Sequence, residues 1–246
     1  MTGSLRIDPK WPLLLLPGTL CDARVFGPWL DAMAGDPALA GRRVLHADIS
    51  GCNSAPALAA QLLDAMPAHF IPLGFSLGAI VALELALMAP DRVAAMVLVA
   101  ANGRDVPAGD HAARRVAAAS DPVTLVGNTL WPRSVAPSRQ NDDQLRKLIA
   151  DMARTAPPGA LAMQTEVALT RSDKRPWLAG MAMPTLVLGG GLDMIAPVAL
   201  QRELADGLPN ATLRIAADAG HFLPLERPDF CARVLAEWLA TAYALN

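Results

Sequence analysis

Residues 74–78 read GFSLG and separate the apolar run HFIPL (69–73) from the longer apolar run AIVALELALMA (79–89). The first run has the length of a buried strand and the second has the length of a helix, so the pattern places Ser76 on a strand-to-helix turn. Gly74 and Gly78 carry no Cβ, which lets a strand and a helix pack closely around such a turn. A serine held there is a candidate nucleophile, whereas a glycine-rich turn that merely contains a serine is the alternative.

Apolar runs of strand length alternate with longer runs of helical period on both sides of this turn. Strands are predicted at residues 13–18, 42–49, 69–75, 92–100, 184–190 and 211–217. Helices are predicted at residues 24–33, 55–66, 76–90, 197–208 and 228–244. This alternation is typical of crossover connections, and the strands are apolar throughout rather than alternating, as in a sheet covered on both faces. The predicted fold class is α/β, with a mostly parallel, doubly wound sheet.

The stretch 103–180 breaks the alternation because it contains no predicted strand. Four segments separated by Pro and Gly have helical patterns, and Ser138 is the predicted N-cap of the third. We expect residues 1–102 and 181–246 to form the core and residues 103–180 to form a helical cap (lid) inserted between two core strands. Such a cap would cover the carboxyl edge of the sheet, where α/β proteins bind ligands. An ordinary helical subdomain is the alternative.

Composition excludes several classes of protein. The chain has 246 residues, 53% of them hydrophobic, and a net charge of −2 without a basic stripe, so nucleic acid is not an expected partner. No apolar run has the roughly 20 residues of a membrane helix, and LLLL (13–16) lacks the flanks of a signal peptide, so we expect a cytoplasmic protein. The three cysteines form no C-x-x-C pair and are interpreted as buried free thiols. We expect a small-molecule substrate and no metal or organic cofactor; the oligomeric state stays open.

A serine hydroxyl is a poor nucleophile until a base takes its proton. Among the four histidines, His221 follows the last predicted strand in AADAGHFLPLERPDF (216–230), from where it could reach Ser76. His46 and His69 are interpreted as structural histidines of strands, and His111 as an exposed cap residue. His221 is therefore the candidate base, and a loop histidine that only caps the final helix is the alternative.

The base needs an acceptor that fixes its tautomer and stabilises the imidazolium. In VLGGGLDMIAP (187–197) a strand ends in three glycines and Asp193 follows, and the loops of Asp193 and His221 open on the same edge of the sheet. Asp105 and Asp218 are the alternatives. A role for Asp193 as a helix cap near Pro197 is the simpler structural interpretation.

Four segments in order resemble those of the α/β-hydrolase superfamily, in particular its small, helix-capped serine hydrolases: LLLPGTLCD (14–22), GFSLG (74–78), GGGLDMIAP (189–197) and AGHFLPLERP (219–228). The resemblance covers nearly the whole chain. It implies a triad in the family order, Ser76, Asp193 and His221, with Ser76 on a strained nucleophile elbow. It extends to short-chain methyl ester esterases that act on carrier-bound acyl groups, without distinguishing them from other capped hydrolases.

The resemblance also implies two backbone N–H donors for the oxyanion. Leu77 supplies one, and the residue after the family's His-Gly pair supplies the other, which places it at Thr19 with Leu20 as the second choice. Pro17 stands where the family usually has the histidine, and its side chain has no group to hydrogen-bond the loop. Its fixed φ is then the means of holding the loop, and a simple turn with no catalytic role is the alternative.

Apolar residues of the cap are candidates for the wall of an acyl pocket, although at helical spacing a core role is the alternative. They are Leu130, Trp131, Leu148, Met152 and Met163. The cap cations Arg114, Arg115, Arg146, Lys147 and Arg154 could meet a carboxylate or a carrier phosphate, or simply form a solvated face.

The sequence thus favours a serine esterase that works through an acyl-enzyme. The same triad would serve a hydrolase of carbon–carbon bonds, lactones, thioesters or amides, because these reactions differ in the pocket. A non-catalytic binding module on the same fold is a third possibility, and an intact triad argues against it.

Overall fold

The computed structural model describes residues 7–244 of the chain, so residues 1–6 and 245–246 of the predicted core lie outside the described range. A six-stranded sheet with the order β2-β1-β3-β4-β5-β6 forms the centre, and all its neighbouring strands run parallel. The strands are β1 (Leu13–Leu16), β2 (Val44–His46), β3 (Ile71–Phe75), β4 (Met96–Val99), β5 (Thr185–Gly190) and β6 (Ala211–Ala216). The predicted α/β fold class is confirmed.

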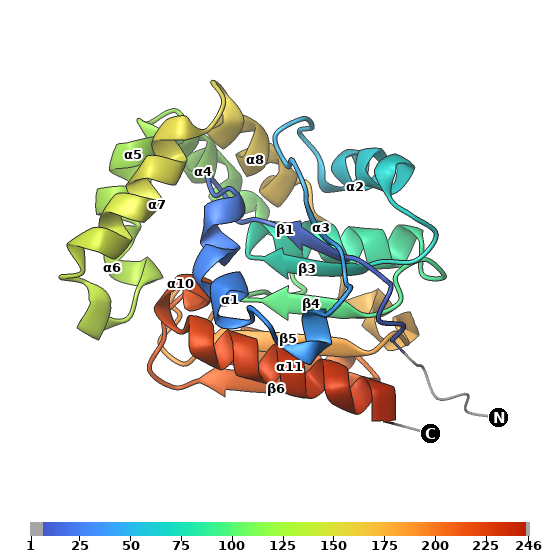
Figure 1. Ribbon diagram of the computed structural model, residues 1–246. Helices are drawn as coiled ribbons and strands as arrows, with labels where there is room; N and C mark the ends of the chain where they lie inside the picture. Colours follow the sequence, from blue (N-terminus) through green and yellow to red (C-terminus); the bar gives the residue numbers. More distant parts are fainter. Residues whose placement is uncertain (1–6, 245–246) are drawn as a thin grey trace.

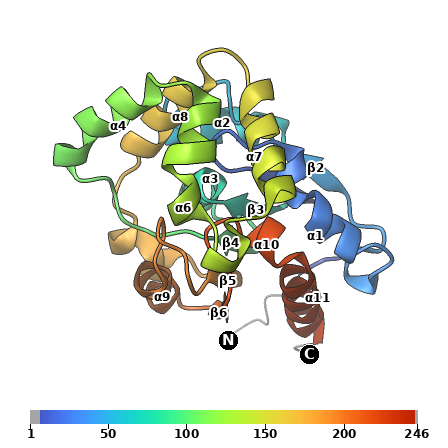
Figure 2. The same ribbon diagram turned by 90° about the vertical axis from the view of Figure 1, so that its left-hand side faces the viewer.

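Helices cover both faces of this sheet. One face carries α1 (Gly27–Ala32) and α11 (Pro228–Ala244), and the other carries α2 (Ala55–Ala65) and α3 (Leu77–Met88) (Figure 1). Helix α9 (Val198–Gly207) lies on the side of the sheet opposite α11 (Figure 2) and shares the apolar cluster of α2 and α3. The side chains of β1 alternate between two apolar clusters, with Leu13 and Leu15 in the first and Leu14 and Leu16 in the second. The sheet therefore buries both faces, which is why its strands are continuously apolar.

Every described element between β4 and β5 is helical. These elements are η3 (Ala108–Asp110), α4 (His111–Ala118), α5 (Pro122–Thr124), the π-helical turn η4 (Leu125–Thr129), α6 (Trp131–Ser134), η5 (Pro137–Arg139), α7 (Asp143–Thr155), α8 (Ala160–Leu169) and η6 (Arg175–Gly180). Helices α4 to α8 gather at the end of the sheet to which the strand arrows point (Figure 1), and they face the viewer when the molecule is turned by 90° (Figure 2). We call residues 103–180 the cap; it lies at the carboxyl edge of the sheet.

The predicted N-cap of the third cap helix is wrong. Helix α7 begins at Asp143, and the Asp142 side chain caps it by accepting from the Leu145 N–H at 2.9 Å. Ser138 lies in the preceding 3-10 turn η5. A carboxylate beside the first turn caps well, and the sequence pattern does not show that the intervening residues form a separate turn. Within residues 7–244, no helix is long and apolar enough to cross a bilayer.

Candidate active site

Ser76 lies on the turn between β3 and α3, as predicted, with φ 53° and ψ −109°. Only two other described residues besides glycine have positive φ, Leu20 (56°) and Ala100 (52°). All three residues line one cavity at the carboxyl ends of β1, β3 and β4. Unfavourable backbone conformations of this kind cluster at functional sites, where the surrounding structure maintains them.

The two glycines of GFSLG are required by close backbone contacts. A Cβ on Gly74 would lie 2.4 Å from the Gly78 oxygen, and a Cβ on Gly78 would lie 1.9 Å from the Leu16 oxygen. The second contact brings the end of β1 against the start of α3. A Cβ on Gly18 would also lie 3.4 Å from the Ser76 Cβ, so the loop after β1 passes directly beside the serine.

The structure brings the three predicted triad residues together in a line. Ser76 Oγ lies 2.9 Å from His221 Nε2, and His221 Nδ1 lies 2.8 Å from Asp193 Oδ2. His221 and Asp193 are buried, whereas Ser76 is partly open to the cavity. A carboxylate oxygen at Nδ1 fixes the tautomer in which Nδ1 carries the proton, so Nε2 is free to accept the serine proton.

Asp193 contacts both His221 and its own loop, but it does not cap α9, whose N-cap Pro197 has no side-chain hydrogen bond. Its Oδ1 accepts from the N–H groups of Ile195 (2.7 Å) and Ala196 (2.8 Å), while its Oδ2 holds His221. The alternatives lie elsewhere, because Asp105 is exposed and Asp218 is exposed and paired with Arg227. The bonds to the loop N–H groups fix the carboxylate before it meets the imidazole.

The other histidines are not at the triad. His46 ends β2 and is exposed, and His69 is exposed beside the Trp11 ring, just before β3 rather than in it. His111 begins α4 and is half-buried rather than exposed, with Nε2 3.0 Å from the Val106 oxygen. His221 is therefore the histidine that reaches Ser76, which agrees with the sequence prediction.

A second acidic residue, which sequence reasoning missed, holds the histidine loop. Glu226 is buried in the short helix α10 (Leu223–Glu226), and its Oε2 accepts from the N–H groups of Gly220 (3.0 Å) and Ala136 (2.8 Å). Burial raises the pKa of Glu226 above its usual range. The cap residue Ser134 also supports this loop, because its carbonyl accepts from the His221 N–H at 2.9 Å. The histidine loop is therefore fixed from both the core and the cap.

The two loops that frame Ser76 offer free backbone donors. Leu77 is the first residue of α3, and within the described residues neither its N–H nor that of Thr19 donates to a protein acceptor. The Leu20 N–H, in contrast, donates to the side-chain oxygen of Gln164 at 2.8 Å. Of the two donors considered in the first loop, Thr19 is therefore the available one. Gln164 is a buried residue of α8 that sequence reasoning did not identify.

The cavity above the triad has a volume of about 430 Å³. Among the residues predicted to line it, Leu130 does so. Trp131, Leu148, Met152 and Met163 do not, so the prediction for these four is wrong. Leu148 is half-buried against the same apolar cluster as Trp131 and Met152. Trp131 and Met152 are buried in the core of the cap, and the Trp131 Nε1–H donates to the Gln140 carbonyl at 3.0 Å.

The rotation of helix α8 about its axis explains why Met163 does not line the cavity. The residues of α8 that line the cavity are Leu161, Gln164, Thr165 and Ala168, which lie on one face of the helix. Met163 precedes Gln164 by one residue and thus points about 100° away from it around the helix axis.

Cys21 is a cavity residue, but it is not a competing nucleophile. Burial, together with the neighbouring Asp22 carboxylate, raises the pKa of the Cys21 thiol to about 12. The thiolate is the reactive form of cysteine, so this thiol is inert near neutral pH. Cys52 and Cys231 are also free thiols, but only Cys231 is fully buried, whereas Cys21 and Cys52 are partly exposed, so the prediction of three buried thiols is wrong for these two. Within residues 7–244, no group of three or more His, Cys, Asp or Glu side chains is arranged to hold a metal ion.

Comparison with known proteins agrees with this geometry. A family model described as the alpha/beta hydrolase fold matches residues 12–228, and the chain belongs to this family of hydrolases. The chain is similar to the pimeloyl-(acyl-carrier protein) methyl ester esterase of Chromobacterium violaceum, with 31% identity over 222 residues, 82% of this chain and 86% of the relative.

Solved structures show the same fold. A thermophilic esterase from Thermogutta terrifontis superposes with a TM-score of 0.82 at 24% identity, over 95% of this chain and 90% of that one. The enol-lactonase of Burkholderia xenovorans superposes with a TM-score of 0.80 at 22% identity, over 94% and 92% of the two chains. The resemblance inferred from the four sequence segments is thus confirmed at the level of family and fold.

Proposed function

We propose that the protein is a serine hydrolase that cleaves a carboxylic ester through an acyl-enzyme, with Ser76, His221 and Asp193 as its triad. The observation that carries the proposal is the chain of two hydrogen-bond distances, 2.9 Å from Ser76 Oγ to His221 Nε2 and 2.8 Å from His221 Nδ1 to Asp193 Oδ2. A binding module needs no such chain, and an activated serine does.

The reaction proceeds in two halves. His221 Nε2 accepts the hydroxyl proton while Ser76 Oγ bonds to the ester carbonyl carbon, and the carbonyl electron pair moves to oxygen. The N–H groups of Thr19 and Leu77 donate to this oxyanion. The tetrahedral intermediate then expels the alkoxide, which takes the proton from His221, and leaves Ser76 acylated. Water attacks the acyl-enzyme with His221 as base, and the acid leaves as Ser76 Oγ regains its proton.

Two features support an ester as the substrate. The chain is similar to an enzyme named as a methyl ester esterase, and its fold is that of a named esterase. The same steps would open a lactone or cleave a thioester, an amide or an activated carbon–carbon bond, and a panel of substrates with matched acyl groups decides between these bonds.

A fluorophosphonate probe tests the proposal directly, because it reacts covalently with an activated serine. We expect stoichiometric addition of the probe mass at Ser76, no addition in Ser76→Ala and a strongly slowed addition in His221→Ala. Ser138→Ala, which removes an exposed cap serine, is the matched control and should label like the wild type. A folded wild-type protein that neither labels nor cleaves short-chain esters would contradict the proposal.

A further inference from the structure

The wall of the cavity carries positive charge without any acidic residue. Arg114 of α4, Arg133 of α6 and Arg171, just after α8, line it, and no Asp or Glu is among the described residues that do so. The remaining lining is apolar or neutral, apart from the histidine of the triad. A substrate that enters this cavity therefore meets three guanidinium groups.

None of these three arginines forms an ion pair with a described residue. Within residues 7–244, Arg114 makes no hydrogen bond and no ion pair with the protein. Arg171 donates through Nε to the Arg104 carbonyl at 2.7 Å, and its terminal amino groups have no protein acceptor. Arg133 donates to the Met194 carbonyl at 3.3 Å, which leaves its charge uncompensated but its position fixed.

Most neighbouring cations outside the cavity are paired with carboxylates. The pairs are Arg104 with Glu203, Arg115 with Glu166, Arg175 with Asp173, and Lys147 and Arg154 with Asp151. Arg146 is an exception outside the cavity, because it donates to the Gly127 carbonyl at 2.9 Å and to Asn128 Oδ1 at 2.7 Å. Most outer cations of this region thus have a carboxylate partner, whereas the three arginines of the cavity wall have none.

The unpaired arginines are close enough to repel each other. Burial and the charge of Arg114 lower the pKa of Arg171 to about 10. Asp105 opposes this shift, but it is exposed and forms no ion pair with Arg171. A ligand anion between the two guanidinium groups would remove the repulsion and satisfy the terminal amino groups, since charge-assisted hydrogen bonds to a carboxylate suit this geometry.

The position of Arg171 relative to the triad follows from α8. Gln164, Ala168 and Arg171 follow one another at spacings of four and three residues and all line the cavity. Gln164 contacts the loop beside Ser76. Helix α8 ends at Leu169, about 8 Å farther along its axis at 1.5 Å per residue, and Arg171 follows two residues later. The arginine pair therefore faces the part of a substrate that is distant from the reacting carbonyl.

We propose that the substrate carries a carboxylate at the end distant from its ester, and that Arg171 and Arg114 bind this carboxylate. This inference rests on the proposed function only for the ester that is cleaved, and not for the carboxylate at the other end of the substrate. It assigns the substrate to the half-esters of dicarboxylic acids and makes the two arginines determinants of specificity.

The kinetic test compares monomethyl esters of linear dicarboxylic acids with the ω-carboxamide methyl esters of equal length, which have the same shape without the charge. We expect kcat/KM of the wild type to favour the charged ester at least about tenfold at one chain length. Arg114→Gln and Arg171→Gln should each reduce this preference, and the double variant should abolish it. Arg171→Lys, which keeps a cation, should restore part of it.

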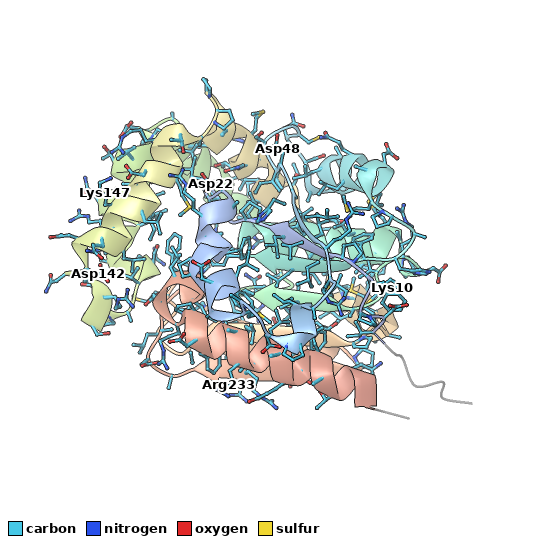
Figure 3. All side chains as sticks on the ribbon, viewed as in Figure 1. Lys10, Asp22, Asp48, Asp142, Lys147 and Arg233 are labelled. Atoms are coloured by element: carbon cyan, nitrogen blue, oxygen red, sulfur yellow. The ribbon has the colours of Figure 1, made fainter. Side chains whose placement is uncertain are left out.

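Lys147→Gln is the matched control, because Lys147 lies on the outer surface of the cap (Figure 3) and its removal lowers the net charge equally. It should leave the preference unchanged, which separates a local contact from a general electrostatic effect. Because Arg114 makes no hydrogen bond or ion pair with a described residue, its replacement removes none, and the single variant remains interpretable if the double variant unfolds.

A binding measurement separates this inference from the proposed function. Calorimetry with Ser76→Ala and the uncleaved monomethyl esters should give a lower Kd for the charged ligand than for its amide, and the added Arg114→Gln and Arg171→Gln changes should remove the difference. Equal affinity for the charged and neutral ligands, or a preference that survives both arginine changes, would overturn the inference. If the wild type cleaved neither ester while the charged ligand still bound better, the esterase function would fail and the carboxylate site would stand.

Discussion

Replacing Gln164 tests whether the cap holds the oxyanion loop. In Gln164→Met the side chain keeps its length but loses the oxygen that accepts from the Leu20 N–H at 2.8 Å. Leu20 is buried, so the orphaned donor costs about 1–3 kcal/mol. The Leu20 backbone, at φ 56°, is itself held at a cost of about 1–3 kcal/mol. The free energy of the lost hydrogen bond is thus as large as the backbone strain at Leu20 that this bond opposes. We therefore expect the loop to relax.

Relaxation of Leu20 would move the adjacent Thr19 N–H away from the oxyanion. Complete loss of one such donor lowers kcat by about 100–1000-fold. We therefore expect kcat of Gln164→Met on short-chain p-nitrophenyl esters to fall by between about tenfold and 1000-fold, with partial relaxation at the lower limit. KM should change little, because the donor acts mainly on the tetrahedral state.

Gln164→Glu provides the matched comparison, because it keeps an oxygen acceptor at the same position. Its kcat should lie well above that of Gln164→Met even if the buried carboxyl lowers the melting temperature. Circular dichroism confirms that both variants fold, and the rate of fluorophosphonate labelling reports the serine separately. A folded Gln164→Met with kcat within about twofold of wild type would refute the reasoning, as would a Gln164→Glu that is equally slow.

Three further changes test other parts of the site. In Gly78→Ala the new Cβ would lie 1.9 Å from the Leu16 backbone oxygen, so we expect the unfolding free energy, measured by denaturant titration, to fall by about 2–3 kcal/mol. Gly109→Ala is the control, because a Cβ there has no neighbour within 4 Å, and it should cost less than about 1 kcal/mol. Asp193→Asn should lower kcat by about 10³–10⁴-fold at unchanged melting temperature, because the amide can still cap its loop but no longer fixes the His221 tautomer. The raised pKa of Glu226 means that the folded state binds its proton more tightly than the unfolded state, so this group's contribution to stability is complete below pH about 4.5 and is lost as pH rises through the folded pKa. Melting temperatures measured across this range should show that decline in the wild type and not in Glu226→Gln; an identical decline in both would assign it to another group.

The sequence predicted the parts of the site that depend on local pattern and element order. Ser76, Asp193 and His221 each follow a strand of one parallel sheet, so their loops necessarily open on one edge. The cavity lining depends instead on how each cap helix is rotated about its axis. Apolar cap residues are equally suited to the cap's own core, and Trp131 and Met152 lie there. Residue type alone does not distinguish these two positions.

Contacts between segments that are far apart in the chain could also not be predicted from the sequence. Gln164 and Leu20 are 144 positions apart, and nothing near either residue signals the bond between them. The sequence did show that this loop lacks a side-chain hydrogen bond of its own, because Pro17 has no side-chain group that can form one. A glutamine from the cap supplies the missing bond to the same loop, so the fixed φ of Pro17 is not the only restraint.

These contacts bear on whether the cap is a lid or an ordinary subdomain. Its helix α8 holds the loop beside Ser76 through Gln164, and its residue Ser134 accepts from the His221 N–H. A cap that swung away as a rigid body would break both bonds and release the donor loop and the base loop together. The catalytic geometry therefore depends on a seated cap, and substrate entry by full opening would require the site to reassemble before each reaction. Gln164→Met breaks one of these two connections and leaves the other intact, so its effect on kcat measures how far the cap contributes to the arrangement of the site.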